Sequence, residues 1–259
     1  MRLHFLGTGT SFGVPVIGCT CAVCASKDPR NKRTRHSLAL QRGDRVLLVD
    51  TPPELRLQLL SSTIGRVDAV FLSHMHADHL HGIDDLRIFS MRDRRPLPMY
   101  IAVEYAEQLR KRFDYIFDDA IEPSPGTSAP EIDLHTFAVG SSLSIAGFEL
   151  TPLAFPHGRM SSYGFRCGPL GVIIDGKRIP QQARDLLLGI EVLVINALWW
   201  GNPHPTHFNV EEAIEVSADL GVAKTYLTHL THRLDYQELS QRLPAGVYAA
   251  YDGLTVELE

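Results

Sequence analysis

A dense group of metal-binding residue types lies between positions 73 and 79. In an extended segment side chains alternate, so His74 and His76 point to the same side and can share one ion. Asp78 and His79 would then lie on the first turn of a helix and face a second ion. Imidazoles with a carboxylate suit Zn²⁺, and also Mn²⁺ or Fe²⁺. A polar loop with a helix-capping aspartate does not explain this density, which is read directly from the segment SHMHADH.

Three later residues of the same types each follow an apolar run. His157 precedes a glycine, Asp175 ends the run Gly171–Ile174, and His229 follows Thr225–Thr228. Four ligands cannot complete two metal sites, so we expect these residues to supply the remainder. Taken singly, each is equally compatible with an ordinary turn.

A second group consists of cysteines. Cys19, Cys21 and Cys24 fall within six positions, and Cys167 stands far from them. A tight, odd-numbered cluster is typical of a metal site rather than of a disulfide framework. We interpret Cys167 as a small buried apolar residue.

The composition is that of a folded globular domain. The chain has 259 residues, 44% hydrophobic and 21% charged, with 25 Lys+Arg against 30 Asp+Glu and a net charge of −5. These values exclude a disordered chain or a coiled coil. The mild acidity argues against a protein that grips nucleic acid mainly through its overall field, although a local basic channel stays open. We expect a cytoplasmic protein with no membrane span and no signal peptide.

Apolar runs and helical patterns alternate along the chain, which indicates an α/β protein with two or more sheets. We predict one domain over residues 1–259, with a small metal-binding loop near 18–24 and a proline-rich loop, a candidate lid, over Asp118–Pro130. The predicted strands are Leu3–Leu6, Ser37–Leu40, Val46–Val49, Ala69–Leu72, Met99–Val103, Val172–Ile174, Val192–Ile195, Thr225–Leu227 and Thr255–Leu258. The predicted helices are Pro53–Leu60, Asp78–Phe89, Val103–Phe113, Pro180–Leu188, Val210–Leu220 and Tyr236–Leu243.

The order of these motifs resembles the metallo-β-lactamase fold superfamily. That resemblance implies an αββα sandwich of four layers and two catalytic divalent metals, Zn or Mn. It also makes Asp50, at the end of Val46–Val49, similar to a residue that orients metal ligands. The implied ligands of one ion are His74, His76 and His157; those of the other are Asp78, His79 and His229; and Asp175 bridges both.

The cysteine loop narrows the resemblance to the phosphoribosyl cyclic phosphate phosphodiesterases of the carbon–phosphorus lyase pathway. In that group three such cysteines and a histidine three residues after the last active-site ligand bind a structural zinc. The corresponding set here is Cys19, Cys21, Cys24 and His232. A Cys3His set is closed and leaves no room for water.

The resemblance implies a phosphodiesterase acting on small or cyclic phosphodiesters through a hydroxide shared by the two ions. We expect Asp175 to be essential and His207, which resembles the family's general acid, to protonate the leaving group. Two alternatives stay open: a carrier similar to the pyrroloquinoline quinone synthesis protein, and a tRNA-processing endonuclease. The expected partners are a small phosphodiester or nucleotide-like substrate, no membrane, and a second copy in a possible homodimer. His36 and His81 are interpreted as residues outside the metal site.

Overall fold

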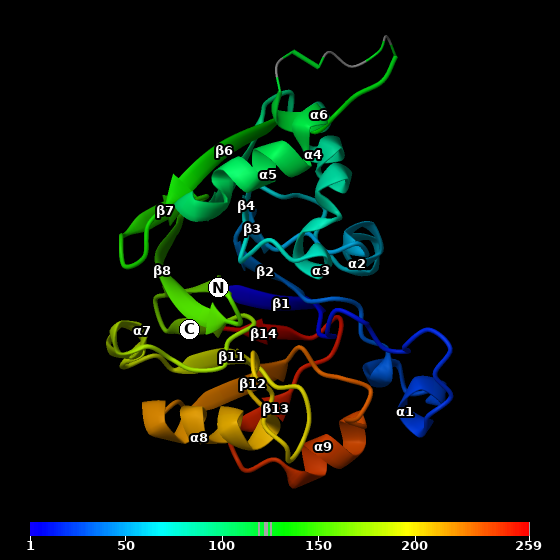
Figure 1. Ribbon diagram of the computed structural model, residues 1–259, viewed down its shortest axis with the longest axis vertical. Coiled ribbons are helices and arrows are strands. Elements are labelled where there is room, and N and C mark those ends of the chain that lie inside the picture. The colour runs from blue at the N-terminus through cyan, green and yellow to red at the C-terminus, as the bar shows by residue number, and fades with distance from the viewer. Residues whose placement is uncertain (119, 122–123, 125, 259) are drawn as a thin grey trace.

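The computed structural model describes residues 1–118, 120–121, 124 and 126–258, and its strands form two seven-stranded sheets (Figure 1). The first sheet has the order β14-β1-β2-β3-β4-β5-β6, and the second β13-β12-β11-β10-β9-β8-β7. The first contains β1 (Arg2–Gly7), β2 (Ser37–Arg42), β3 (Arg45–Val49), β4 (Ala69–Phe71), β5 (Leu97–Ala102), β6 (Ile132–Phe137) and β14 (Thr255–Glu257). The second contains β7 (Leu143–Ile145), β8 (Phe148–His157), β9 (Met160–Cys167), β10 (Leu170–Ile173), β11 (Val192–Asn196), β12 (Lys224–Thr228) and β13 (Val247–Ala249).

Each sheet is antiparallel at one end and parallel at the other. The strands from β3 to β6 pair in parallel, as do those from β10 to β13. Parallel neighbours need crossover connections, which here are mostly helical. The helices are α1 (Ala22–Ala25), α2 (Leu55–Ser61), α3 (Ala77–Leu80), α4 (Arg87–Asp93), α5 (Ala106–Arg112), α6 (Asp114–Phe117), α7 (Gln181–Leu187), α8 (Val210–Leu220) and α9 (Tyr236–Arg242), with 3-10 turns at Pro29–Asn31, Ile83–Leu86 and Val103–Tyr105.

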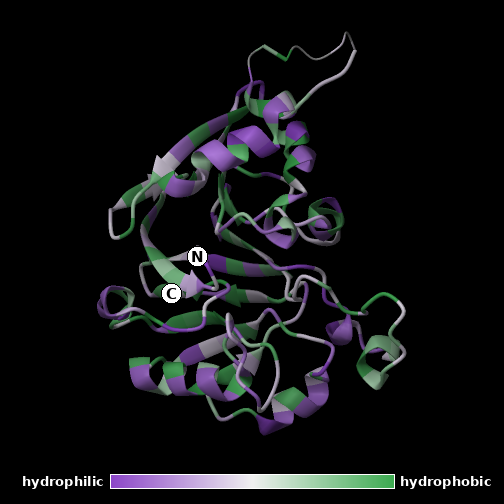
Figure 2. Ribbon diagram, in the orientation of Figure 1, coloured by the Kyte–Doolittle hydropathy of each residue, from purple (hydrophilic) through white to green (hydrophobic). Residues whose placement is uncertain are grey.

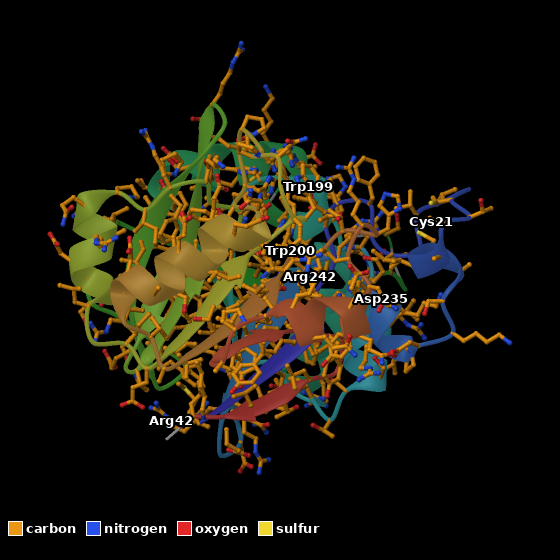
Figure 3. The ribbon with its side chains drawn as sticks, turned by 90° about the horizontal axis from the view of Figure 1, so that it is seen from below. Cys21, Arg42, Trp199, Trp200, Asp235 and Arg242 are labelled. Carbon is orange, nitrogen blue, oxygen red and sulfur yellow. The ribbon has the colours of Figure 1, made fainter. Side chains whose placement is uncertain are left out.

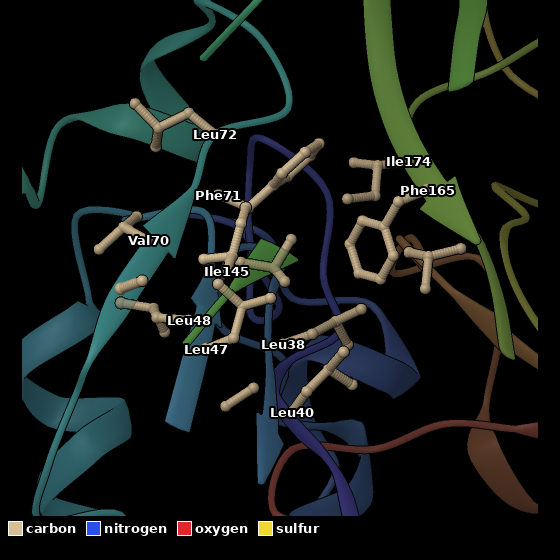
Figure 4. Close-up of a cluster of buried hydrophobic side chains, with 14 of the residues drawn as sticks. Leu38, Leu40, Leu47, Leu48, Val70, Phe71, Leu72, Ile145, Phe165 and Ile174 are labelled. Carbon is tan, nitrogen blue, oxygen red and sulfur yellow. The ribbon is translucent and has the colours of Figure 1, made fainter. Parts of the chain in front are cut away.

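The two sheets pack face to face, and the helices cover their outer faces (Figure 1). Phe71 of the first sheet meets Phe165 of the second edge to face, with ring centroids 5.2 Å apart. Both rings lie in a buried apolar cluster that includes Leu38, Leu47 and Ile174 (Figure 4). Burying this shared face is what holds the sheets together. The four-layer αββα architecture predicted from the sequence is confirmed.

Helix α8 begins at a well-defined residue, which fixes the end of the loop before it. Its hydropathy alternates along the ribbon in Figure 2, and Val210 and Ala213 pack inward. Asn209 caps the first turn by accepting the N–H of Glu212, whose carboxylate accepts the N–H of Asn209 in return. This capping box fixes the point at which the loop carrying His207 enters the helix.

The predicted helix Asp78–Phe89 is wrong as a single element. The chain instead forms α3, a 3-10 turn and α4. The break falls at Gly82, whose N–H donates to the Thr51 carbonyl. A Cβ on Gly82 would lie 2.1 Å from the Pro52 carbonyl oxygen, so the close approach of the two segments requires glycine. Packing against this turn overrides the helical periodicity.

The sequence prediction also missed the strands from β6 to β9 and β13. Two prolines, Pro152 and Pro156, lie inside β8, and proline usually argues against a strand. They are tolerated because β7 pairs only with the first three residues of β8, and the rest of β8 pairs as a strand with β9 alone, while the Pro152 carbonyl accepts the Gly140 N–H. One side of that segment needs no ladder N–H.

The proline-rich segment Asp118–Pro130 contains neither helix nor strand among its described residues. Positions 119, 122, 123 and 125 lie outside the described residues, and the lid stays a prediction. Among the described residues, no helix has both the length and the apolar character that a membrane span requires.

Candidate metal centre

The candidate ligands meet at one edge of the two sheets, where strands end. His74 to His79 follow β4, His157 is the last residue of β8, Asp175 follows β10, and His229 follows β12. Sequence alone predicted that these residues lie at strand ends, and the fold brings those ends together.

Two of these candidate ligands, and also Asp50 at the end of β3, have a left-handed backbone. The φ angles are 64° at Asp50, 48° at Asp175 and 58° at His229. Such angles are uncommon outside glycine and cluster at functional sites, because they cost stability and persist only where the surroundings impose them. Here they turn each side chain from the strand end toward the others.

The first group gathers three imidazoles and a carboxylate. The Nε2 atoms of His74 and His157 lie 2.9 and 3.2 Å from His76 Nδ1. Asp175 Oδ2 is 3.7 Å from His74 Nε2 and 3.9 Å from His157 Nε2. All four donor atoms fall within 4.8 Å of one another. This donor set suits a divalent transition metal such as zinc.

The second group shares Asp175 with the first. Asp175 Oδ2 lies 3.2 Å from His79 Nε2, and Asp175 Oδ1 lies 3.3 Å from His229 Nδ1. Asp78 Oδ2 completes the set at 3.4 Å from His79 Nε2. Asp175 Oδ2 thus faces His74 and His157 of the first group as well as His79 of the second, so this carboxylate lies between the two groups.

Buried atoms without partners show that the residues fit metal ions. His79 Nε2, Asp175 Oδ1 and His229 Nδ1 are buried and have no hydrogen-bond partner among the described residues. Buried polar atoms are normally satisfied, so three unsatisfied ones pointing at one centre need an explanation. Their chemistry, two imidazole nitrogens and a carboxylate oxygen, is that of a metal-binding set.

Burial and mutual charge put most of these groups in the protonation states that metal binding requires. Burial lowers the pKa of His74, and lowers that of His229 to about 3, so both rings are neutral near pH 7. Burial alone would raise the pKa of Asp175, but the histidines around it, His229 first, hold it well below its usual range. His79 is the exception: burial opposes its charge, yet Asp175 and Asp78 raise its pKa. The cluster therefore favours a positive charge at its centre.

Asp50 lies behind the candidate ligands and is linked to them through hydrogen bonds. Its Oδ2 accepts the Nδ1–H of His79 at 2.6 Å and the hydroxyl of Ser73 at 2.8 Å, while its Oδ1 accepts the Ser73 N–H at 2.8 Å. The Ser73 hydroxyl lies 2.9 Å from His74 Nδ1, and because it donates to Asp50 it accepts a hydrogen bond from the Nδ1–H. One buried carboxylate thus leaves the Nε2 lone pairs of both histidines free.

His36 belongs to this neighbourhood, which the sequence prediction missed. Its ring is buried, and its centroid lies 5.8 Å from that of His79 and 6.2 Å from that of His229. Burial lowers its pKa to about 4, so it packs there as a neutral ring. The available signal was its place just before β2, whose start pairs with the end of β3 next to Asp50. His81 contacts Phe113 and is in neither group.

His207 reaches the centre from the loop between β11 and α8. Its Nε2 lies 3.4 Å from Asp175 Oδ2 and is buried without a hydrogen-bond partner in the described structure. Its Nδ1 lies 2.9 Å from the hydroxyl of Thr206, whose backbone carbonyl is 3.2 Å from His157 Nδ1. The loop therefore positions a spare imidazole and orients a candidate ligand at the same time.

A cavity of about 420 Å³ opens over the two groups. Its lining includes His76, Asp78 and His207, together with Ser11 and Arg159. A single guanidinium beside a cluster of histidines and carboxylates suits a small anionic substrate.

The cysteine group lies on the loop between β1 and β2. The Sγ atoms of Cys19, Cys21 and Cys24 lie 3.4, 3.6 and 3.6 Å from His232 Nδ1. All four donors are within 4.8 Å of one another, the compact arrangement that a tetrahedral ion needs. The Cys24 N–H donates to Cys21 Sγ and lowers the pKa of that thiol to about 6, which favours the thiolate form that binds metal.

Comparison with known proteins agrees with this geometry. A family model described as a beta-lactamase superfamily domain matches residues 45–230. The chain therefore belongs to the beta-lactamase superfamily. Its fold is the metallo-β-lactamase fold, which is a fold of hydrolases. A crystal structure described as a new diphosphatase from the PhnP family is 34% identical, with a TM-score of 0.90 over 100% of this chain and 98% of that one.

Two further proteins are similar to this chain, one over half of its own length and one in fold. An octanoyltransferase from Porphyromonas gingivalis is 36% identical over 257 residues, 98% of this chain and 51% of that protein, so the chain spans about half the length of that relative. Zinc-bound PqqB from Methylobacterium extorquens has a TM-score of 0.80 over the whole of both chains at 19% identity, which is a likeness of fold.

Proposed function

We propose that this chain is a metal-dependent phosphodiesterase acting on small or cyclic phosphodiesters. The observation that carries the proposal is the pair of four-donor groups that share Asp175. The 34% identity to a protein described as a diphosphatase supports a phosphoryl substrate. In this assignment His74, His76 and His157 hold one ion; Asp78, His79 and His229 hold the other; and Asp175 holds both. Cys19, Cys21, Cys24 and His232 hold a structural zinc.

Two divalent ions at these groups would supply Lewis acidity and a nucleophile derived from water near neutral pH. The chain's own residues do the rest. Asp50 and the Thr206 carbonyl fix the tautomers of His79 and His157. The cavity wall at Arg159 supplies a cation for the substrate's phosphoryl charge.

His207 is proposed to hand a proton to the leaving oxygen. An alkoxide leaving group needs that proton, because its conjugate acid is an alcohol, which is too weak an acid for the alkoxide to be expelled readily at pH 7. The His207 Nε2 atom has no hydrogen-bond partner in the described chain and lies over the cavity, beside Asp175. The Thr206 hydroxyl, 2.9 Å from Nδ1, holds the ring with its Nε2 toward the cavity.

The test combines metal content with turnover. The purified protein should contain two ions in the shared centre and one zinc at the cysteines, and it should hydrolyse bis(p-nitrophenyl) phosphate. Replacing Asp175 by alanine should remove both ions of the shared centre and the activity, while the cysteine zinc stays. A metal-loaded protein that turns over no phosphodiester and no diphosphate would contradict the proposal and favour a carrier.

A further inference from the structure

A second pocket, of about 350 Å³, adjoins the cavity over the candidate metal centre. The two share Ser11, His207 and His229. The outer walls of the second pocket differ from those of the first, since they include Phe12, Trp199 and the hydrophobic Leu198. Holding metals or a phosphoryl group requires none of these apolar walls.

Phe12 is held in an unfavourable place for an apolar side chain. The side chain is 73% exposed at the tip of the turn after β1. That turn is fixed, because the Gly13 N–H donates to the Thr10 carbonyl and Arg35 Nε donates to the Ser11 carbonyl at 2.9 Å. A single exposed apolar side chain is ordinary on a protein surface, but Phe12 lines the same pocket as Trp199, so it is one of two aromatic walls beside the polar centre.

Trp199 lines the same pocket, and its orientation is also fixed. Its indole N–H donates to the Asn202 carbonyl at 2.8 Å, and the His204 ring meets it edge-on at 5.4 Å. The Arg233 guanidinium lies 4.5 Å from the ring centroid. Trp200 does not line the pocket. Its ring centroid lies 4.1 Å from the guanidinium of Arg242, which is labelled beside it in Figure 3. Only the first of the two tryptophans serves this site.

The lining selects for a flat, electron-rich group. It contains two aromatic walls, four histidines and one guanidinium, and no carboxylate. Aromatic rings and guanidinium planes both stack on planar heteroaromatic rings. The pocket volume lies in the range of small-molecule sites, and the shared wall places such a ring next to a phosphoryl group in the first cavity.

We infer that the substrate carries a planar heteroaromatic group, as a nucleoside does, and that this group stacks in the pocket walled by Phe12 and Trp199. The inference rests on the proposed phosphodiesterase function for the position of the phosphoryl group. It deepens that function by naming the class of substrate: a nucleoside phosphodiester rather than a simple alkyl or sugar phosphodiester.

Fluorescence tests the inference without turnover. The chain has two tryptophans, so in a Trp200→Phe protein carrying its metals the emission reports Trp199 alone. Adenosine 5′-monophosphate should quench that emission and bind about tenfold more tightly than ribose 5-phosphate, measured by its displacement of the nucleotide. Adding Phe12→Ala should weaken nucleotide binding about tenfold. The matched control is Ile17→Ala, because Ile17 is 98% exposed on the same loop and does not line the pocket.

The outcomes separate the two proposals. If the protein hydrolyses bis(p-nitrophenyl) phosphate but binds adenosine 5′-monophosphate no better than ribose 5-phosphate, the aromatic subsite is overturned and the phosphodiesterase stands. If nucleotide binding depends on Phe12 but no phosphodiester is hydrolysed, the subsite stands and the proposed function fails. The comparison of the two probes requires no pocket variant, so a poorly folded Phe12→Ala protein does not block the test.

Discussion

Replacing Asp50 by asparagine should weaken metal binding most at the group that contains His79, less at the group that contains His74, which Asp50 reaches only through Ser73, and not at the cysteine group. The carboxylate is fully buried and accepts three hydrogen bonds, the shortest from His79 Nδ1–H at 2.6 Å. With an amide nitrogen in place of Oδ2, the amide N–H of the introduced asparagine would face the Nδ1–H of His79, and two donors cannot form a hydrogen bond. The His79 proton would then move to Nε2, the nitrogen that faces Asp175.

The magnitude follows from the charged hydrogen bond. Hydrogen bonds to ionised groups contribute about 1.5–3 kcal/mol, and every 1.4 kcal/mol is about tenfold in affinity. We therefore expect the affinity for the ion held by Asp78, His79 and His229 to fall about 10–100-fold, the range typical of residues that orient metal ligands. Zinc titration against a competing chelator measures each affinity.

Two controls make the result specific. The cysteine group is an internal one, since Asp50 does not contact it and its zinc affinity should not change. Asp68→Asn is the matched variant, because Asp68 is also a buried aspartate but pairs with Arg66. Equal metal affinities in wild type and Asp50→Asn, or an equal loss at the cysteine group, would refute the reasoning.

Three further predictions follow from the same structure. Asp175→Ala should abolish turnover in a folded protein. Cys21→Ala should instead lower the melting temperature, because structural zinc contributes directly to folding. Equal melting temperatures for Cys21→Ala and wild type would contradict the proposed structural zinc site. His207→Ala should lower kcat about 10²–10⁴-fold on diesters with alkyl leaving groups and much less on p-nitrophenyl diesters, so equal losses on both would exclude proton donation. Burial alone would raise the pKa of Asp68, but Arg66 and a backbone N–H lower it; its contribution to stability is complete above about pH 4 and is lost as the pH falls through the lowered value. Urea unfolding should therefore show a smaller loss of stability between pH 5 and 2 in Asp68→Asn than in wild type, and parallel curves would contradict this.

Local spacing was enough to predict half of the candidate site. His74, His76, Asp78 and His79 occupy six positions, so one strand end and one helical turn place them together whatever the rest of the chain does. The cysteine loop is similar, because Cys19, Cys21 and Cys24 are joined by a short turn. Apolar runs likewise predicted most strands, since a buried strand must be apolar almost throughout.

Other features depended on contacts between distant segments. The helix predicted through Gly82 is broken because the chain packs against the Pro52 carbonyl, which no periodicity reveals. The strand containing Pro152 and Pro156 was missed because only the sheet order shows that one side of it needs no N–H. His36 was set aside as an isolated residue because its neighbours, His79 and His229, lie far along the chain.

The sequence by itself determined which chemistry is present: imidazoles, carboxylates and thiols in numbers that suit metal ions. The family resemblance implied a bridging role for Asp175, but only the tertiary structure gives its distances to both groups and the pocket that Phe12 and Trp199 line beside them. The physical reason is that ligand type is a property of single residues, whereas a shared bridge and a cavity are properties of distances. Those distances are set by packing two sheets whose strand ends meet at one edge.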